Sequence, residues 1–532
     1  MPVTINDPGG SGNITINEPG QPGMSIQAGE PGGIPVAVAS HLYGADASVT
    51  QATDTIAANA GAGELAGFKN NLQLTAFVNP YDADQTVAEL QAMANTGKIR
   101  HNLYIPTDRW KNPTGGAIGI IPDYLATAWT SAGVAAFGVT LGAAKATRTP
   151  NHGQQMYDLT GGALGWDATA GLGANGGQEL FGMLDAIDSY YLTNLGRKFS
   201  TGAYRNGRDE GKTMLMQYLL AGRNSNLNFA SFSGSAYTNY GKNGSNFLGN
   251  PQALNTRQDR ISAFCSSRTY DESVSFAMGT FAQAKTHTTA QVAATVANGG
   301  YFLDFTHWHS VGSAPQVGEI MAAIAAGLSG FVYRGDFGSI MEYLFLRDMV
   351  TGARAVQNGS VITVSVDLAD PYKTTYQGID TTILYDRISV PISIFIDLTG
   401  TSFEGARIGT DNGTLRHVSG DVYVLSIPFN GEEGTISAQL RTVNTDDYLN
   451  FDLPVITGSS EVGATLTVTT DMPTKAVLFK VATGGAESAS TVHVRYNDFS
   501  TSHNFDIAGL EAYDLRVGVL SEAGQSILSE VL

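Results

Sequence analysis

The pattern of apolar positions between Ile34 and about Val350 alternates short apolar runs with helical stretches. Pro35–Ala39 and Leu72–Val78 are predicted strands, and Thr53–Ala60 between them has a helical pattern. A capping box at Thr86–Glu89 opens a predicted helix that ends at Gly97. This βαβα order predicts a parallel sheet or barrel, in which reactive groups gather at the carboxyl ends of the strands.

Two further amphipathic helices are predicted within the same region. Their apolar positions keep helical spacing and are Leu180, Leu184, Ile187, Tyr191 and Leu195 in one, and Val317, Ile320, Met321, Ile324 and Leu328 in the other. Residues 143–258 interrupt the rhythm with Asn, Gly, Ser and Tyr. Insertions of this kind lie at the surface and often bind ligands, although a decorated loop without a partner fits the composition as well.

After Val350 the apolar period changes from helical to alternating. Residues 362–368 and 392–396 place an apolar side chain at every second position, and Asn-Gly turns at Asn358, Asn412 and Asn430 separate the strands. This pattern predicts a β-sandwich over 351–455. A new alternating run after Pro454 predicts a second small antiparallel β-domain over 456–532.

The first 35 residues contain 8 Gly and 6 Pro and repeat one phrase three times, beginning at Thr4, Thr15 and Ser25. Each copy is a short β-like dipeptide followed by a turn, so the segment has no core of its own. It is either a flexible leader or an arm that becomes ordered on a neighbouring subunit. The threefold repeat favours the attachment arm.

Composition and charge narrow the class of protein. At about 150 residues per domain, 532 residues predict three or four domains. The net charge of −18 argues against a nucleic-acid partner, because phosphates would be repelled. A single cysteine, Cys265, excludes an intrachain disulfide. The most apolar stretch, Ile320–Tyr333, is too short and too rich in glycine to span a bilayer, and no signal peptide is visible at the N-terminus, so we expect no membrane insertion.

The densest candidate for chemistry is Tyr301–His309, an apolar strand that ends in two histidines around Trp308. His307 and His309 share a face if the strand continues, and together they would hold a metal or a sugar. Asp304 would lie on the opposite face unless the strand ends before it. The alternative interpretation is that the two histidines are polar residues at a strand end and bind no ligand.

Several of these segments resemble the polysaccharide deacetylase family. Leu74–Asn79 and Val87–His101 resemble its second strand, helix and third strand, Ser262–Thr269 resembles its arginine motif, and Gly300–His307 resembles its final strand. The resemblance covers about residues 34–345, with a large insertion. It implies a β/α barrel over 36–350, with His101 as a metal ligand and His307 as the general acid.

The departures from that family are equally informative. The paired Asp residues expected after the first strand are replaced by Ser40 and His41, with Asp46 the nearest carboxylate, and the second metal-binding His is absent. Losing the base and a ligand should abolish the usual metal-activated water. Either the barrel no longer catalyses a reaction and needs no cofactor, or a rebuilt site holds zinc or another divalent metal. The residues of such a rebuilt site would be His41, Asp46, His101, His307 and His309.

Three functions follow from these observations. The first is a bacteriophage virion protein of the tail or head fibre type, which binds other virion subunits through residues 1–35 and host surface polysaccharide through a degenerate barrel; we expect it to form a homo-oligomer and to reside in the virion. The second is an active metal-dependent polysaccharide deacetylase or esterase with carbohydrate-binding β-domains. The third is a structural subunit that contacts only other subunits.

Overall fold

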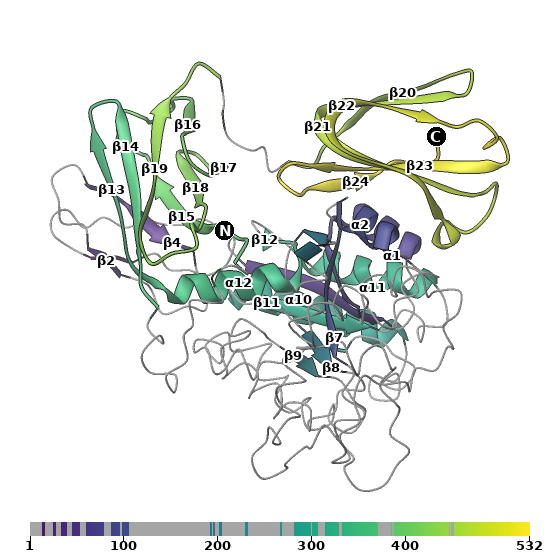
Figure 1. Cartoon of the computed structure of the whole chain (residues 1–532), viewed down its shortest axis with the longest axis horizontal. Helices are drawn as coiled ribbons and strands as arrows, with labels where there is room; N and C mark the ends of the chain where they lie inside the picture. The colour runs from purple at the N-terminus through teal and green to yellow at the C-terminus, as the bar shows by residue number, and fades with distance from the viewer. Residues whose placement is uncertain are drawn as a thin grey trace, which may run out of the picture.

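The computed structural model describes a β-rich multidomain protein (Figure 1). The described residues are 13–15, 25–27, 33–39, 45–53, 60–78, 87–95, 98–105, 192–193, 195–196, 202–204, 229–231, 267–268, 281–298, 301–306, 314–328, 332–370, 385, 388–445, 447 and 452–532. Figure 1 shows a sandwich beside helix α12 and a C-terminal β-domain over helices α1 and α11. No helix within these ranges is long and apolar enough to cross a membrane.

A parallel sheet forms the centre of the chain. Its strands follow the order β10-β11-β5-β6-β7-β8-β9, with β12 also paired to β5, and every described pairing is parallel. The strand bounds are β5 Ala45–Thr53, β6 Leu74–Val78, β7 Ile99–Ile105, β8 Gly202–Tyr204, β9 Phe229–Ser231, β10 Ser267–Arg268, β11 Tyr301–Thr306 and β12 Val332–Tyr333. The described pairings show a parallel α/β sheet, and among the described residues they do not close it between the end strands β9 and β10 into the β/α barrel that the resemblance implied.

The helices accompany this sheet as the βαβα pattern predicts. Their bounds are α1 Ala60–Asn70, α2 Val87–Asn95, α10 Phe281–Asn298, α11 Ala314–Gly327 and α12 Phe337–Asp348. The predicted strand at Leu72–Val78 and the helix that follows Thr86 are confirmed as β6 and α2. Of the helical stretch expected at 53–60, Thr53 is the last residue of β5 and Ala60 is the first residue of α1, and the residues between them lie outside the described residues.

The insertion over 143–258 also contains two short strands that the sequence did not predict. It contributes β8 and β9, which extend the parallel sheet beyond β7. Neither strand is longer than three residues, and a strand this short gives no periodic signal in the sequence.

The predicted sandwich is confirmed, but each of its two sheets takes one strand from the N-terminal side of the chain. One sheet has the order β16-β19-β14-β13-β3 and the other β17-β18-β15-β4, all antiparallel. The bounds are β3 Gly33–Ile34, β4 Val36–Val38, β13 Val350–Asn358, β14 Val361–Leu368, β15 Ile392–Asp397, β16 Ile408–Thr410, β17 Thr414–Ser419, β18 Val422–Ile427 and β19 Gly434–Thr442. The sandwich therefore starts before the α/β region and is completed after it.

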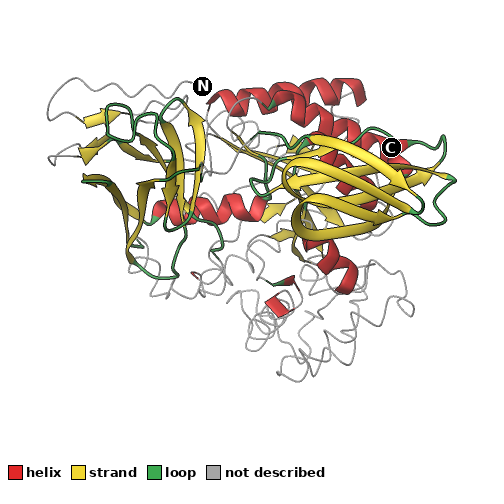
Figure 2. Ribbon diagram, turned by 90° about the horizontal axis from the view of Figure 1, so that it is seen from above, coloured by secondary structure: helices red, strands yellow, loops and turns green. Residues whose placement is uncertain are grey.

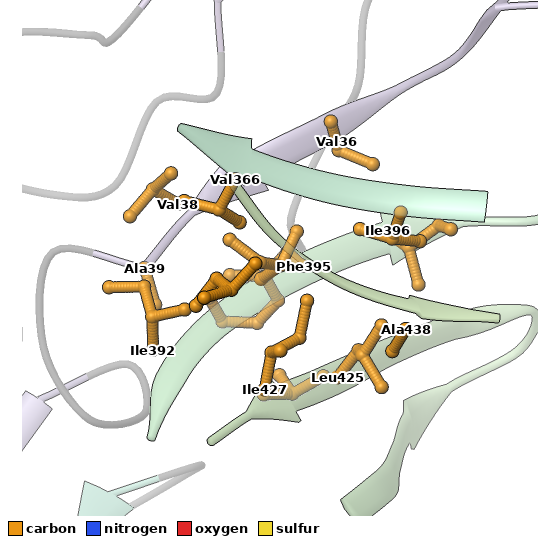
Figure 3. Packing of buried hydrophobic residues seen from close by; sticks show 14 of the residues in the cluster. Val36, Val38, Ala39, Val366, Ile392, Phe395, Ile396, Leu425, Ile427 and Ala438 are labelled. Carbon is orange, nitrogen blue, oxygen red and sulfur yellow. The ribbon is translucent and has the colours of Figure 1, made fainter. Parts of the chain in front are cut away.

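Residues 35–39 do not form the first strand of the parallel sheet. Val36–Val38 pairs antiparallel with β15, and its side chains lie in the sandwich core beside Ile396 and Phe395 (Figure 3). The reason is that Val36, Ala37, Val38 and Ala39 are all buried, and the inter-sheet core takes in this continuous apolar run. The first parallel strand is β5, so the boundary that we placed at residue 36 is wrong for this segment.

The Asn-Gly turns occur where the sequence places them. Gly359, Gly413 and Gly431 all adopt positive φ, at 61°, 93° and 83°. A Cβ on Gly413 would lie 2.0 Å from the carbonyl oxygen of Ser426, so only glycine fits this turn.

The C-terminal domain is one strongly bent antiparallel sheet. Its strands are β20 Ile456–Val462, β21 Thr465–Ala482, β22 Thr491–Asp506, β23 Tyr513–Ser521 and β24 Ser526–Leu528, with a short 3₁₀ turn η5 at Glu487–Ala489. β21 pairs with β20 along its first half, with β23 along its second half and with β22 along both. This arrangement encloses an apolar core that includes Leu478, Phe505 and Val517.

Helix α1 joins this domain to the α/β sheet (Figure 1). Figure 2 shows helices beside the strands of the C-terminal domain. Phe68 is fully buried against Phe479, with ring centroids 5.9 Å apart in an edge-to-face arrangement. The fully buried Glu64 accepts a charge-assisted hydrogen bond of 2.6 Å from Arg495. At the C-terminal end of α1, Asn71 donates to the Gln525 side chain at 2.7 Å and accepts from the Ser526 amide at 2.8 Å. Apolar packing and buried polar contacts therefore both stabilise the joint.

A substitution at Gly518 tests this joint. A Cβ at that position would lie 2.6 Å from Cγ of Phe68, so we expect Gly518→Ala to lower the free energy of unfolding by about 1–3 kcal/mol through overpacking. Gly352→Ala is the matched control, because the same atom there meets only one side-chain oxygen at 3.6 Å. Urea unfolding compares the two variants. Equal stability of both would contradict the packing shown here.

Candidate functional site

The strand register shows where the described members of the predicted histidine site lie. His101 in β7 pairs with Ala76, which pairs with Gln51, which pairs with Thr306 at the end of β11. His101 is therefore level with the residue that precedes His307. Asp304 is level with Val49 and with Ser267. His41, His307 and His309 lie outside the described residues.

Asp46 is not in register with His101 across the sheet. It is the second residue of β5 and pairs with Tyr301 and Tyr333, five positions before Gln51. At about 3.3 Å per residue, Asp46 lies roughly 17 Å along the strand direction from the level of His101. The backbone register therefore does not place Asp46 and His101 at one level of the sheet, and a shared metal at these two residues stays a prediction. The levels differ because Asp46 stands at the amino end of its strand.

His101 and the end of β11 are also separated across the sheet. Two strands, β5 and β6, lie between β7 and β11, which is three interstrand steps or roughly 14 Å along the sheet surface. Among the described residues, no group of three or more His, Cys, Asp or Glu side chains is arranged to hold a metal ion.

The best-defined polar cluster forms around Arg100, the second residue of β7, which directly precedes His101. Arg100, only 5% exposed, donates through Nη1 to Asp336 at 2.6 Å and through Nη2 to Glu342 at 2.5 Å. Asp336 also caps helix α12, since it accepts the Ser339 amide at 3.0 Å. Glu342 accepts both the amide and the hydroxyl of Ser389 at 2.8 Å, which links α12 to the segment that leads into β15. We call these residues the Arg100 cluster: Arg100, Asp336, Ser339, Glu342 and Ser389.

A cavity of about 290 Å³ opens beside the Arg100 cluster, between α12 and the sandwich. The described residues that line it are Gln73, Tyr333, Asp336, Ser339, Ser389, Val390, Pro391, Ser393, Arg416 and Ser426. Arg416 donates to the Ser426 hydroxyl at 2.9 Å, and that hydroxyl lies 3.3 Å from the Ser393 hydroxyl. The lining is therefore rich in hydroxyl groups and includes one cation and one carboxylate.

The chemistry of this cavity fits binding better than catalysis. Ser339 and Ser389 both donate their hydroxyl protons to carboxylates, and no imidazole is among the described lining residues. A nucleophilic serine needs an adjacent base that is itself oriented by a third group.

Lys98, just before β7, is the most unusual titratable group among the described residues. Burial, together with the nearby positive charge of Arg334, lowers the pKa of its ammonium group to about 7. Its Nζ lies 5.6 Å from the centroid of the Phe68 ring, a cation–π distance. Lys98 therefore stands beside the joint with the C-terminal domain.

The C-terminal domain contains a second buried polar pair. Nε2 of His503 lies 3.1 Å from the Thr474 hydroxyl, and the imidazole stacks on Tyr496 with ring centroids 6.3 Å apart. Burial lowers the pKa of His503. With both residues inside the bent sheet, this pair serves packing.

Sequence reasoning missed the Arg100 cluster and the cavity. The residues Asp336-Phe-Gly-Ser339 before an apolar run are an N-cap signal that would have located the start of α12. No sequence signal pairs Arg100 with residues more than 230 positions away. That pairing depends on the fold bringing Asp336 and Glu342 within reach of the Arg100 side chain.

Comparisons with known proteins assign no family. No family model matches the chain, and no curated protein matches it. Among solved structures, endo-glycoceramidase II from Rhodococcus sp. is similar at 11% identity and a TM-score of 0.23, covering 70% of this chain and 97% of that one. A GH30 endoxylanase from Clostridium papyrosolvens C71 is similar at 10% identity and a TM-score of 0.21, covering 77% and 98%. At these TM-scores the likeness assigns neither fold nor function.

Proposed function

We propose that this chain is a recognition protein of a bacteriophage particle that binds host surface carbohydrate and does not deacetylate it. The observation that carries the proposal is the register of the parallel sheet. It separates Asp46 from the level of His101 by roughly 17 Å along the strands. Asp46 is the carboxylate nearest to the position where polysaccharide deacetylases carry their Asp pair, and in this proposal it does not share a site with the histidine. A metal-activated water needs its ligands and base around one point.

The arrangement of the β-domains supports a binding role. Buried contacts attach the sandwich to α12 through Glu342 and Tyr343, whose hydroxyl donates to the Ala39 carbonyl at 2.6 Å. Buried contacts of Glu64 and Asn71 attach the C-terminal domain to α1. A rigid assembly presents its surfaces in one geometry, which lowers the entropic cost of binding an extended polysaccharide.

The N-terminal repeats fit attachment to other subunits of the particle. Asn13–Thr15, which runs into the second copy of the repeated phrase, pairs antiparallel with Ser25–Gln27 at the start of the third copy, with Ile14 opposite Ile26. Gly33–Ile34 belongs to the sandwich, so the proposed arm ends at residue 32 and not at 35. In this proposal residues 1–32 contact neighbouring virion subunits, and the chain works as a homo-oligomer.

Parallel assays of binding and acetate release test the function. We expect the purified chain to bind an N-acetylated surface polysaccharide without releasing acetate. Trp308→Ala should weaken binding about three- to tenfold, because an aromatic ring contributes about 0.5–1.5 kcal/mol beyond the area that it buries. The matched control is Tyr513→Ala, which removes an exposed aromatic side chain of the C-terminal domain.

The same assays identify the competing function. Acetate release at enzyme-like rates that His307→Ala abolishes and His417→Ala leaves unchanged would establish the metal-dependent deacetylase instead. His417 suits this control because it lies on β17 of the sandwich, where its Nε2 contacts the Gly420 carbonyl oxygen at 2.8 Å. A chain that neither binds nor cleaves the polysaccharide would contradict both functions.

A further inference from the structure

We propose that the cavity between α12 and the sandwich binds one uncharged sugar unit of the carbohydrate ligand. The sugar class rests on the proposed function, and the location rests on the cavity itself. We call this cavity the junction cavity; its lining includes Gln73 and Tyr333 from the α/β side and Ser393, Arg416 and Ser426 from the sandwich.

The size and position of the junction cavity suit a small ligand. Its volume of about 290 Å³ is close to the lower end of small-molecule sites, which begin at roughly 300 Å³. Such sites often lie between domains, as this one does. One sugar ring is a ligand of this size, whereas a folded partner is not.

The charges around the junction cavity balance. Asp336 and Glu342 contribute two negative charges, and Arg100 and Arg416 contribute two positive charges, so the sum is 2 − 2 = 0. Arg100 lies between the two carboxylates and neutralises them at close range. A site without net charge favours neither a phosphate nor a metal cation, and a neutral polyhydroxylated ligand avoids the cost of desolvating an unpaired charge.

The polar groups of the lining match sugar hydroxyl groups. Ser339, Ser389, Ser393 and Ser426 supply hydroxyls. Those of Ser339 and Ser389 donate to carboxylates, so toward a sugar hydroxyl they act as acceptors. Ser393 and Ser426 are each only 1% exposed and are in register on β15 and β18, so the strands hold them in place. Preorganised polar groups reduce the entropy lost on binding.

An aromatic side chain completes the lining. Tyr333 takes its position because Gly335 leaves room for it: a Cβ on Gly335 would lie 1.8 Å from Cζ of the tyrosine ring. An alanine at position 335 would therefore move the ring while leaving the polar groups in place. Sugar rings present apolar faces that pack on aromatic rings, so moving the ring should weaken the proposed contact.

Saturation-transfer NMR and titration of the full-length chain test this site, with glucose, galactose and N-acetylglucosamine as probes. We expect at least one probe to bind the unaltered chain, and we expect Gly335→Ala and Arg416→Met each to raise its Kd at least fivefold. Gly352→Ala and Arg441→Met are the matched controls, a glycine with an open surrounding and an exposed arginine of the same sandwich, and should leave Kd unchanged. Thermal unfolding of each variant shows that it is folded.

The outcomes separate this proposal from the proposed function. Binding of inorganic phosphate or sulfate in place of the sugars would overturn the proposal and show an anion site at Arg416. Binding of no probe, or sugar binding that neither cavity variant changes, would also overturn it, even if the whole polysaccharide still binds. Monosaccharide binding lost in the cavity variants, together with no binding of whole polysaccharide, would support the junction cavity and contradict the proposed function.

Discussion

Replacing Arg100 by methionine is expected to lower the free energy of unfolding by about 3–5 kcal/mol. Asp336 and Glu342 are 2% and 0% exposed, and removing their shared cation leaves two buried carboxylates without it. Breaking a buried ion pair from one side typically has a cost of this size. Urea unfolding of the full-length chain measures it, and a loss below about 1 kcal/mol would contradict the role of the Arg100 cluster.

Two control variants show whether buried charge is the cause. Arg354→Met removes an arginine whose ion pair with Asp367 is exposed, and it should change stability by less than about 1 kcal/mol. The triple variant Arg100→Met, Asp336→Asn, Glu342→Gln removes all three charges, and asparagine still caps α12. We expect the triple variant to recover much of the loss. Equal destabilisation of the single and triple variants would assign the effect to shape rather than to charge.

Replacing Lys98 by methionine is expected to stabilise the protein at neutral pH and to remove a pH dependence. The pKa of Lys98 is about 7 in the folded chain against 10.5 for an ordinary lysine. Between these values the unfolded chain binds more protons than the folded chain, so this group makes stability rise with pH. Below pH 7 Lys98 is charged in both the folded and the unfolded chain, so burying the charged ammonium group destabilises the fold by its full cost. That cost is on the order of 4–5 kcal/mol as an upper value.

The difference between the original chain and Lys98→Met isolates this effect. We expect the variant to be more stable by several kcal/mol at pH 6 and the gap to close as the pH rises from about 7 to 10.5. Lys69→Met is the matched control, because Lys69 lies on the adjacent helix and is 54% exposed. A gap that stays constant over this pH range would show that Lys98 remains charged in the folded chain.

The sequence predicted the secondary structure best where one period runs over many residues. The alternation of Ile362, Val364 and Val366 predicted a sandwich strand, and these side chains lie fully buried in the core. The same reasoning was wrong for Val36–Val38, because a short apolar run fits a parallel strand and a sandwich strand equally well. Only the partner strand, β15, decides between them.

The candidate sites show the same division. Residue types and spacing marked His101 and His307 as chemically capable, but distances across a sheet depend on register and strand order, which no local pattern encodes. The register that places Asp46 roughly 17 Å from the level of His101 arises from pairings among β5, β6 and β7. The Arg100 cluster depends on contacts across more than 230 residues.

By itself, then, the sequence determined the alternation of strands and helices before Val350, the change to β-domains after it, the glycine turns and the excess of negative charge, because each depends on neighbouring residues or on composition. The tertiary structure alone decided that the sandwich takes strands from both sides of the α/β region, that Asp46 and His101 lie at different levels of the sheet, and that Arg100 meets Asp336 and Glu342 beside a polar cavity. The physical reason is that residues far apart in the chain become buried and paired only when whole helices and strands pack together. The free energy of that packing exceeds the local secondary-structure preference of a short segment.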